Sequence, residues 1–359
     1  MKKFSWIVSI IILAIVIVGC SDDASSEGGG DSETVGIAMP TQSSERWVLD
    51  GENMESEFEE LGYEVDLQYA EDVVENQVSQ IENMITRGVD ALVIASIDGE
   101  ALTEVLEQAE NQEIPVIAYD RLIMNSDHVS YYATFDNFKV GELQGQYIEE
   151  ELELADGEGP FNIELFAGSP DDNNAYFYWD GAMSVLQSYI DEGQLVVQSD
   201  QTDFEQGATL RWDGAEAQER MDNLLSAHYS SEEIDVVYSP FDGISRGVIS
   251  SLKAVGYGSD SNSMPIVTGQ DAELSSIKSI IAGEQTQTIF KDTRKLAESA
   301  VDMTDSILND EEPEVNDTET YENGEKVVPS NLLEPISVDI DNYEEELIDS
   351  GYYTEDQLQ

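Results

Sequence analysis

From Thr34 onward, short apolar runs rich in β-branched residues alternate with longer segments of helical periodicity. The first run, TVGIAM at 34–39, precedes an amphipathic stretch over 47–61 that we predict to be a helix. Such alternation is typical of parallel sheets covered by helices. The other predicted strands are YEVDLQY, ALVIAS, PVIAY, FNIELFA, QLVVQ, DVVYS, PIVTG and QTIF. The predicted helices between them cover 77–85, 102–112, 139–152, 174–189, 215–227, 243–254 and 275–282.

The alternation forms two series, one ending near Asp120 and the other beginning after Asp136. The chain has 359 residues, enough for two lobes of ordinary size. No period of about 20 to 50 residues recurs as near-identical sequence, which argues against a solenoid. We therefore expect an α/β fold of two doubly wound parallel-sheet lobes.

The first twenty residues have the pattern of a secretory signal. Lys2 and Lys3 precede an apolar stretch over 7–18, which is too short to span a bilayer comfortably. The stretch leads to Cys20, the only cysteine, in a pattern similar to a bacterial lipobox, where the cysteine is lipidated and becomes the mature N-terminus. An uncleaved membrane anchor is the alternative. Residues 21–33 have the composition of a flexible tether, so we expect a lipid-anchored body outside the cell membrane.

Acidic residues far outnumber basic ones, 77 against 15, and the formal net charge is −62. A field of this sign repels phosphate backbones and argues against nucleic-acid binding. One interpretation is a solvated acidic shell adapted to molar salt, where the Debye length falls to about 3 Å. The alternative is a polyanionic surface for a cationic partner or for metal ions. Because the acids are scattered rather than grouped at ligand spacing, we expect no metal and no other cofactor.

Charged and aromatic side chains gather where the predicted strands end. In open parallel sheets, ligands bind beyond the carboxyl ends of the strands. Four of the scarce basic residues and two of the four tryptophans occupy these positions. The candidate ligand-binding residues are Arg46, Trp47, Asp98, Asp120, Arg121, Asn174, Arg211, Trp212, Asp242, Asp271 and Lys291. Taken singly, Asp98 and Asp242 are explained equally well as helix caps.

This residue set suits carbohydrate recognition. Carboxylates accept hydroxyl protons, while Arg, Lys and Asn donate to the hydroxyl lone pairs, so such a cleft can satisfy a ring of hydroxyls. Trp47 and Trp212 offer flat apolar surfaces to the C–H faces of a sugar. A glycoside hydrolase would need an acid and a nucleophile placed as a pair, and no motif here supplies one. We therefore expect a binding protein, not an enzyme.

Several long motifs support a family resemblance. They include VGIAMPT, NQVSQIENMITRGVDALVIASIDG, VIAYDRLI, VSYYATFDNFKVG, GPFNIELFAGSPDDNNA, TLRWD, GQDAELSSIKSIIAGEQ and TIFKDTR. Through them the chain resembles the periplasmic sugar-binding proteins of ABC importers, most closely the multiple-sugar-binding receptors and more distantly the xylose- and arabinose-binding proteins. The similarity covers 34–359. It implies a type I binding-protein fold with three hinge crossings, one lobe over 34–135 plus 293–334 and the other over 136–292 plus 335–359.

The resemblance also implies roles and partners. Arg46 and Trp47 would bind and stack on the sugar, and Asp120 and Arg121 would take ring hydroxyls. The other candidates would approach from the second lobe and hinge, except Asp98, for which a capping role is an equal alternative. The implied partners are a monosaccharide and the permease of an ABC importer. Presentation to a chemoreceptor or sensor, and binding of a polyol or quorum signal, are alternatives. We expect a monomer that meets the membrane only through its lipid anchor. A sugar-responsive transcription regulator shares this fold but would need a helix-turn-helix before Thr34.

Overall fold

The computed structural model describes residues 32–358. The predicted signal peptide, Cys20 and the tether up to residue 31 lie outside the described residues, so lipidation of Cys20 stays a prediction. Within 32–358, no helix combines the length and the apolar character needed to cross a membrane.

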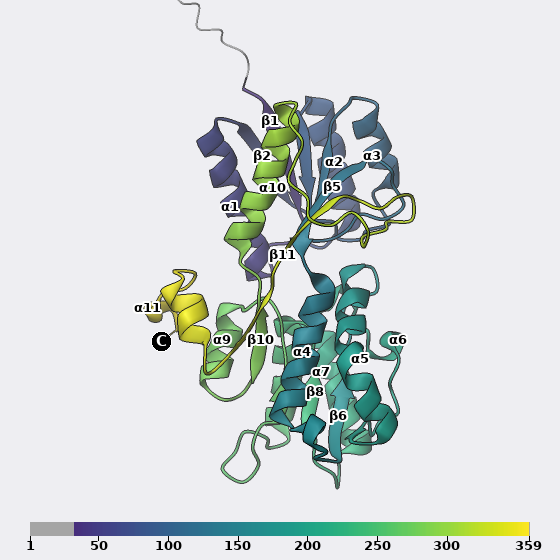
Figure 1. Ribbon diagram of the computed structural model, residues 1–359, viewed down its shortest axis with the longest axis vertical. Coiled ribbons are helices and arrows are strands. Elements are labelled where there is room, and N and C mark those ends of the chain that lie inside the picture. The colour runs from purple at the N-terminus through teal and green to yellow at the C-terminus, as the bar shows by residue number, and fades with distance from the viewer. Residues whose placement is uncertain (1–31, 359) are drawn as a thin grey trace, which may run out of the picture. The chain divides into compact units, whose positions relative to one another are not determined.

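The first lobe, as we use the term, is built on a six-stranded parallel sheet in the order β11-β5-β4-β3-β1-β2 (Figure 1). Its strands are β1 (Thr34–Met39), β2 (Glu64–Tyr69), β3 (Ala91–Ile94), β4 (Val116–Tyr119), β5 (Val129–Phe135) and β11 (Ser330–Leu333). The helices that pack against it are α1 (Glu45–Leu61), α2 (Val74–Arg87), α3 (Thr103–Glu110) and α10 (Thr293–Leu308).

Alternation along the strands gives the first sheet two apolar faces. In β1, Val35, Ile37 and Met39 join the core formed with α1 and α10. Ala38 points to the other face, into the core formed with α2 and α3. Both faces are therefore buried, as expected for a parallel sheet.

The second lobe has a four-stranded parallel sheet in the order β7-β6-β8-β9. These strands are β6 (Phe161–Leu165), β7 (Leu195–Val196), β8 (Val236–Tyr238) and β9 (Ile266–Val267). One core lies between this sheet and the helices α4 (Asn137–Glu151) and α5 (Asn174–Glu192). A second core lies on the side of α7 (Gly214–His228) and α8 (Asp242–Ala254). The remaining helices are α6 (Phe204–Gly207), α9 (Leu274–Ile281) and α11 (Glu355–Leu358).

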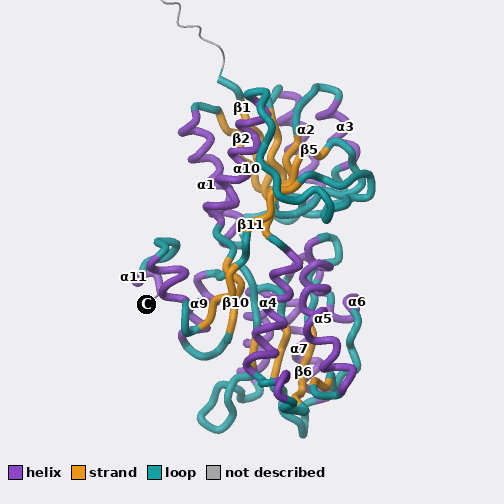
Figure 2. The backbone as a smooth tube through the Cα atoms, viewed as in Figure 1, coloured by secondary structure: helices purple, strands orange, loops and turns teal. Residues whose placement is uncertain are grey.

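A separate two-stranded ribbon completes the second lobe (Figure 2). Here β10 (Gln287–Phe290) pairs with β12 (Ile336–Asp339) in the antiparallel sense. We predicted QTIF, which forms β10, as one more strand of the parallel series, and that detail is wrong. The chain passes between the lobes after β5, between β10 and α10, and between β11 and β12.

Candidate functional site

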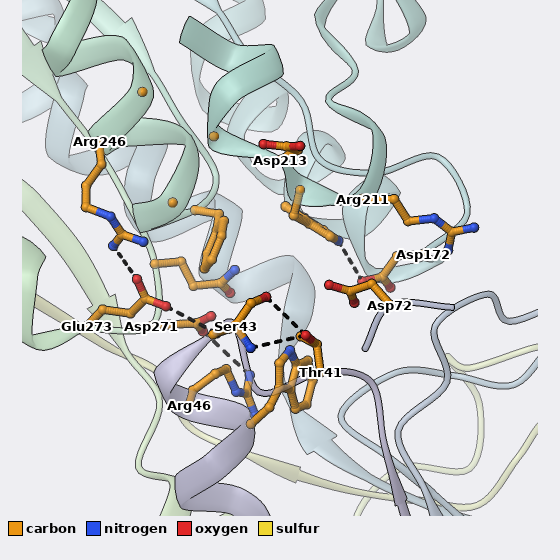
Figure 3. Close-up of a pocket in the computed structure, with 18 of the residues that line it drawn as sticks. Thr41, Ser43, Arg46, Asp72, Asp172, Arg211, Asp213, Arg246, Asp271 and Glu273 are labelled. Atoms are coloured by element: carbon orange, nitrogen blue, oxygen red, sulfur yellow. Dashed lines mark hydrogen bonds and ion pairs between the residues drawn. The ribbon is translucent and has the colours of Figure 1, made fainter. Parts of the chain in front are cut away.

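A cavity of about 630 Å³ lies where strands of both lobes end (Figure 3). Loops that follow β4, β6, β8, β9 and β10 contribute to its wall, together with the start of α1. Its volume is within the range of about 300–1,000 Å³ usual for small-molecule sites. Eight of the eleven candidate residues line it: Arg46, Trp47, Asp120, Arg121, Arg211, Trp212, Asp271 and Lys291.

Arg46, in the first turn of α1, connects several carboxylates at the inner end of the cavity. Its Nε donates to Asp50 Oδ2 at 2.8 Å, and its Nη1 donates to Asp120 Oδ2 at 2.8 Å. Behind them, the hydroxyl of Tyr119 donates to the second oxygen of Asp50. Burial opposes the charge of Arg46, but Asp120, Asp50 and Asp271 raise its pKa well above the ordinary value. The guanidinium therefore stays charged and held in one orientation.

Lys291 and Asp271 extend this cluster. Lys291 Nζ lies 2.9 Å from Asp271 Oδ1 and 3.7 Å from Asp120 Oδ2, and Arg46 Nη1 lies 3.6 Å from Asp271 Oδ1. Burial alone would raise the pKa of Asp120, but Arg46 and Lys291 outweigh it and the pKa is lowered. Asp120 is consequently ionised at neutral pH and offers only acceptors. The inner end thus alternates anchored donors with anchored acceptors.

A second group of ion pairs lies at the other side of the cavity. Arg121 Nε is 3.0 Å from Asp172 Oδ2, and Trp212 Nε1 donates to the same oxygen at 3.3 Å. Burial raises the pKa of Asp172 against the effect of Arg121. The ring of Trp47 packs beneath the guanidinium groups of Arg46 and Arg121, whose carbons lie 4.3 and 5.1 Å from its ring centre.

Four of the candidate residues have left-handed backbone conformations. The φ angles of Asp120, Arg211, Trp212 and Asp271 are 58°, 55°, 58° and 90°. Positive φ is uncommon for residues other than glycine and is disfavoured by about 1–3 kcal/mol each. Such conformations persist only where surrounding packing imposes them, and they gather at functional sites. Within 32–358, these four are among twelve non-glycine residues with positive φ, and their presence around one cavity marks it as a candidate functional site.

Asn174, a predicted ligand-binding residue, does not line the cavity. It is fully buried, and its Nδ2 donates to the backbone oxygen of Asp120 at 2.6 Å. The same oxygen accepts from the Tyr132 hydroxyl at 2.6 Å and from Thr134 Oγ1 at 3.0 Å. Asn174 therefore supports the left-handed turn at Asp120 from behind.

Asp98 and Asp242 also lie outside the cavity wall. Asp98 Oδ1 accepts from the backbone N–H of Glu100 at 3.0 Å and so closes a local turn. Asp242 is fully buried, and its Oδ2 accepts from the backbone N–H of Glu273 at 2.9 Å, while its Oδ1 accepts from Gln285 Nε2 at 2.8 Å. Burial raises the pKa of Asp242 to about 8. Neither residue caps the helix that follows it, which was the alternative explanation.

Sequence reasoning missed three wall residues with distinct roles. Asp172 stands two positions before the chosen Asn174 in the same motif. Glu273 and Arg246 form an ion pair on the second lobe, and Ser44 Oγ of the first lobe donates to Glu273 Oε1 at 3.2 Å. The scarcity of basic residues was a signal that could have identified Arg246.

The charges of the wall nearly balance. Five basic side chains face six acidic ones: Arg46, Arg121, Arg211, Arg246 and Lys291 against Asp72, Asp120, Asp172, Asp213, Asp271 and Glu273. Within 32–358, no group of His, Cys, Asp and Glu is arranged to hold a metal ion. The wall suits an uncharged ligand that both donates and accepts many hydrogen bonds.

Residues 35–312 match the family model described as the periplasmic binding protein domain. The chain belongs to this family. The multiple sugar-binding periplasmic protein SbpA of Azospirillum brasilense is 62% identical over 328 residues, which cover 91% of this chain and 92% of SbpA. The multiple sugar-binding periplasmic receptor ChvE of Rhizobium radiobacter is 57% identical over 349 residues, covering 97% of this chain and 99% of ChvE.

A solved structure agrees with these relatives. It is an ABC transporter solute binding protein from Clostridium phytofermentans with bound β-D-glucose, 52% identical, with a TM-score of 0.88. The match covers 91% of this chain and all of that one. The predicted α/β fold of type I periplasmic binding proteins and the family resemblance are confirmed, and the protein is a binding protein rather than an enzyme.

Proposed function

We propose that this periplasmic binding protein is an extracytoplasmic receptor that encloses a neutral monosaccharide between its two lobes. The observation that carries the proposal is the alternation of Arg46, Asp120, Lys291 and Asp271 at the buried end of the cavity. Each of these charges is anchored by an opposite charge, so a ligand does not have to order them. The hydroxyls of a sugar can donate to the carboxylates and accept from the guanidinium and ammonium groups.

The energetics are compatible with tight binding. A hydrogen bond to a charged group contributes about 1.5–3 kcal/mol, and a micromolar ligand needs about 8 kcal/mol in total. A few such hydrogen bonds, with an apolar ring face against Trp212, are sufficient. The ring of Trp212 packs on Gly168 and lies edge-to-face with Tyr178, which holds its orientation.

The relatives support the ligand class. The names of SbpA and ChvE describe multiple sugar-binding proteins, and the Clostridium structure contains β-D-glucose. We accordingly propose aldoses as ligands, with D-glucose as the first to be tested.

Closure of the two lobes around the sugar is the proposed mechanism. In this mechanism 34–135 plus 293–334 form the first lobe, and 136–292 plus 335–359 form the second. Hydrogen bonds already join the lobes at the cavity, from Ser44 to Glu273 and from Arg211 Nη1 to the backbone oxygen of Ile97 at 3.3 Å. A sugar that contacts both lobes favours the closed form, which the permease of an ABC importer would recognise.

A thermal-shift and calorimetric screen tests ligand binding. We expect D-glucose, D-galactose, D-xylose or L-arabinose at a hundred times its dissociation constant to stabilise the purified protein by about 2.7 kcal/mol. Asp271→Asn should abolish the shift, whereas Asp260→Asn, at an exposed position outside the cavity, should retain it. If no monosaccharide binds the folded protein, the proposal is wrong, and polyols such as myo-inositol are the next ligands to test.

Attachment by a lipid at Cys20 needs its own experiment. Cells that express the chain and grow with a labelled fatty acid should incorporate the label into the wild type and not into Cys20→Ser. Fatty-acid label in the Cys20→Ser variant, or no label in the wild type, would contradict lipidation at Cys20.

A further inference from the structure

The cavity has an enclosed end and an open end. At the enclosed end, only 4% of Arg46 and 3% of Lys291 are exposed. At the open end, Asp213, Gln218 and Ser250 are exposed residues of the second lobe. Figure 3 shows Asp213 and Arg246 across the cavity from Arg46 and Thr41. A ligand held at the enclosed end can therefore project a substituent toward solvent.

The volume is larger than one sugar ring requires. Even at the roughly 30 Å³ that liquid water occupies per heavy atom, a hexose of about a dozen heavy atoms would need only about 360 Å³. The cavity measures about 630 Å³. The difference is enough for a second ring that is partly exposed to solvent.

The open end offers polar groups that keep hydrogen-bonding capacity for a ligand. The side-chain amide of Gln218 has no hydrogen-bond partner among residues 32–358, although it lines the cavity. Arg246 is held in place by Glu273 and by Ser275 Oγ at 3.1 Å, and its side chain is still 38% exposed. Asp213 uses Oδ1 to cap α7, accepting from Ala215 N at 2.7 Å. These groups are suited to the hydroxyls of a second sugar.

The cavity is continuous from its enclosed end to its open end. Phe241 lines the cavity beside Trp212, with ring centres 5.9 Å apart and nearly perpendicular planes. Gly214, Gly243 and Gly247 line the wall beyond them, where α7 and α8 touch through their backbones: a Cβ on Gly247 would lie 2.1 Å from the oxygen of Gly214. No side chain projects from these glycines into the path.

We propose that the open end is a second sugar subsite, so that the receptor accepts disaccharides with one ring at Arg46 and Lys291 and the second beside Gln218 and Arg246. This inference rests on the proposed function. It adds a substrate class and requires no change in the contacts of the first ring.

Calorimetric titration of the purified protein with D-glucose, cellobiose and maltose tests the inference. We expect glucose and at least one disaccharide to bind competitively. Gln218→Trp places a large ring on the part of α7 that lines the open end of the cavity. It should weaken disaccharide binding about tenfold while leaving glucose binding unchanged. Gln187→Trp is the matched control, because Gln187 is an exposed glutamine of α5 outside the cavity and its variant should bind all ligands as the wild type does.

The outcomes separate the two proposals. Glucose binding without binding of either disaccharide overturns the second subsite and leaves the proposed function intact. Disaccharide binding that Gln218→Trp does not weaken also overturns it, because the second ring would then lie elsewhere. Failure of every sugar, including glucose, overturns both.

Discussion

Asn174 of the second lobe donates a hydrogen bond of 2.6 Å to the backbone carbonyl oxygen of Asp120 in the first lobe. The contact is buried, and it holds the left-handed turn from which the Asp120 side chain reaches Arg46 and the cavity. A residue outside the cavity wall thus connects the geometry of the site to the packing of the two lobes.

Asn174→Asp should weaken both stability and sugar binding. The substitution replaces the donor with a carboxylate oxygen facing the Asp120 carbonyl, and an unsatisfied buried group costs about 1–3 kcal/mol. Urea unfolding and calorimetry would measure the two effects. Asn173→Asp is the control, because the neighbouring amide has no side-chain hydrogen bond among residues 32–358 and should change stability by less than about 0.5 kcal/mol. Equal effects at both positions would contradict the role of Asn174.

Gly168→Ala should reduce sugar affinity by displacing Trp212. A Cβ at Gly168 would lie 2.0 Å from the Trp212 ring, so the ring must move. We expect a loss of about tenfold or more, measured by calorimetry. Gly36→Ala separates affinity from stability, because its Cβ would press on Leu92 and Met84 in the first-lobe core, away from the cavity. That variant should melt at a lower temperature and bind sugar normally.

Arg211→Ala should accelerate sugar release. Arg211 Nη1 donates to the Ile97 oxygen of the opposite lobe and pairs with Asp171 at 3.0 Å, so its loss removes a contact that keeps the cavity closed. Stopped-flow tryptophan fluorescence should show an increase of about tenfold in the dissociation rate with little change in association. Arg87→Ala removes a comparable ion pair on the exposed face of α2 and should leave both rates unchanged. An unchanged dissociation rate in Arg211→Ala would show that this contact does not retain the ligand.

Glu57→Gln should stabilise the protein above neutral pH. Burial, together with the nearby charges of Glu298, Asp302 and Glu60, raises the pKa of Glu57 to about 7. Because the folded-state pKa is higher than the unfolded one, this contribution to stability is complete below about pH 4.5 and is lost as pH rises through 7. Glu57 is half-buried and screened by solvent, so we expect a gain of about 1 kcal/mol at pH 8 and none at pH 4.

Denaturant unfolding at the two pH values in low and molar salt would measure the Glu57 effect. The gain should shrink at high salt, where like charges are screened. Glu52→Gln, at an exposed position of the same helix, is the control. A gain that is as large at pH 4 as at pH 8 would exclude ionisation of Glu57 as the cause.

The strands with strong local patterns could be predicted, and those defined by distant pairing could not. The apolar, β-branched run of β1 was predicted at its observed bounds, 34–39. By contrast, β11 is only SNLL and pairs with β5, about two hundred residues earlier in the chain, while β12 pairs with β10 in the antiparallel sense. The sequence of a four-residue segment does not indicate which distant strand it pairs with.

The site shows the same division. The position of the cavity could be predicted, because ligands bind beyond the carboxyl ends of the strands in open parallel sheets, and this rule follows from the topology. The choice between Asp172 and Asn174 could not be made in this way. Asp172 lies in the loop before α5 and Asn174 is the first residue of that helix, so only the tertiary structure decides which of the two side chains faces the cavity.

The position of β11 in the chain also determines the order in which the lobes are completed. Residues of β11 are synthesised after the whole of α4 to α10, yet β11 is an edge strand of the sheet that begins with β1. During translation the first sheet therefore lacks both its last strand and its helix α10, while the four strands of the second sheet are already available. The sheet that starts first is therefore completed after the four strands of the other sheet, and it stays incomplete until nearly the entire polypeptide has been synthesised.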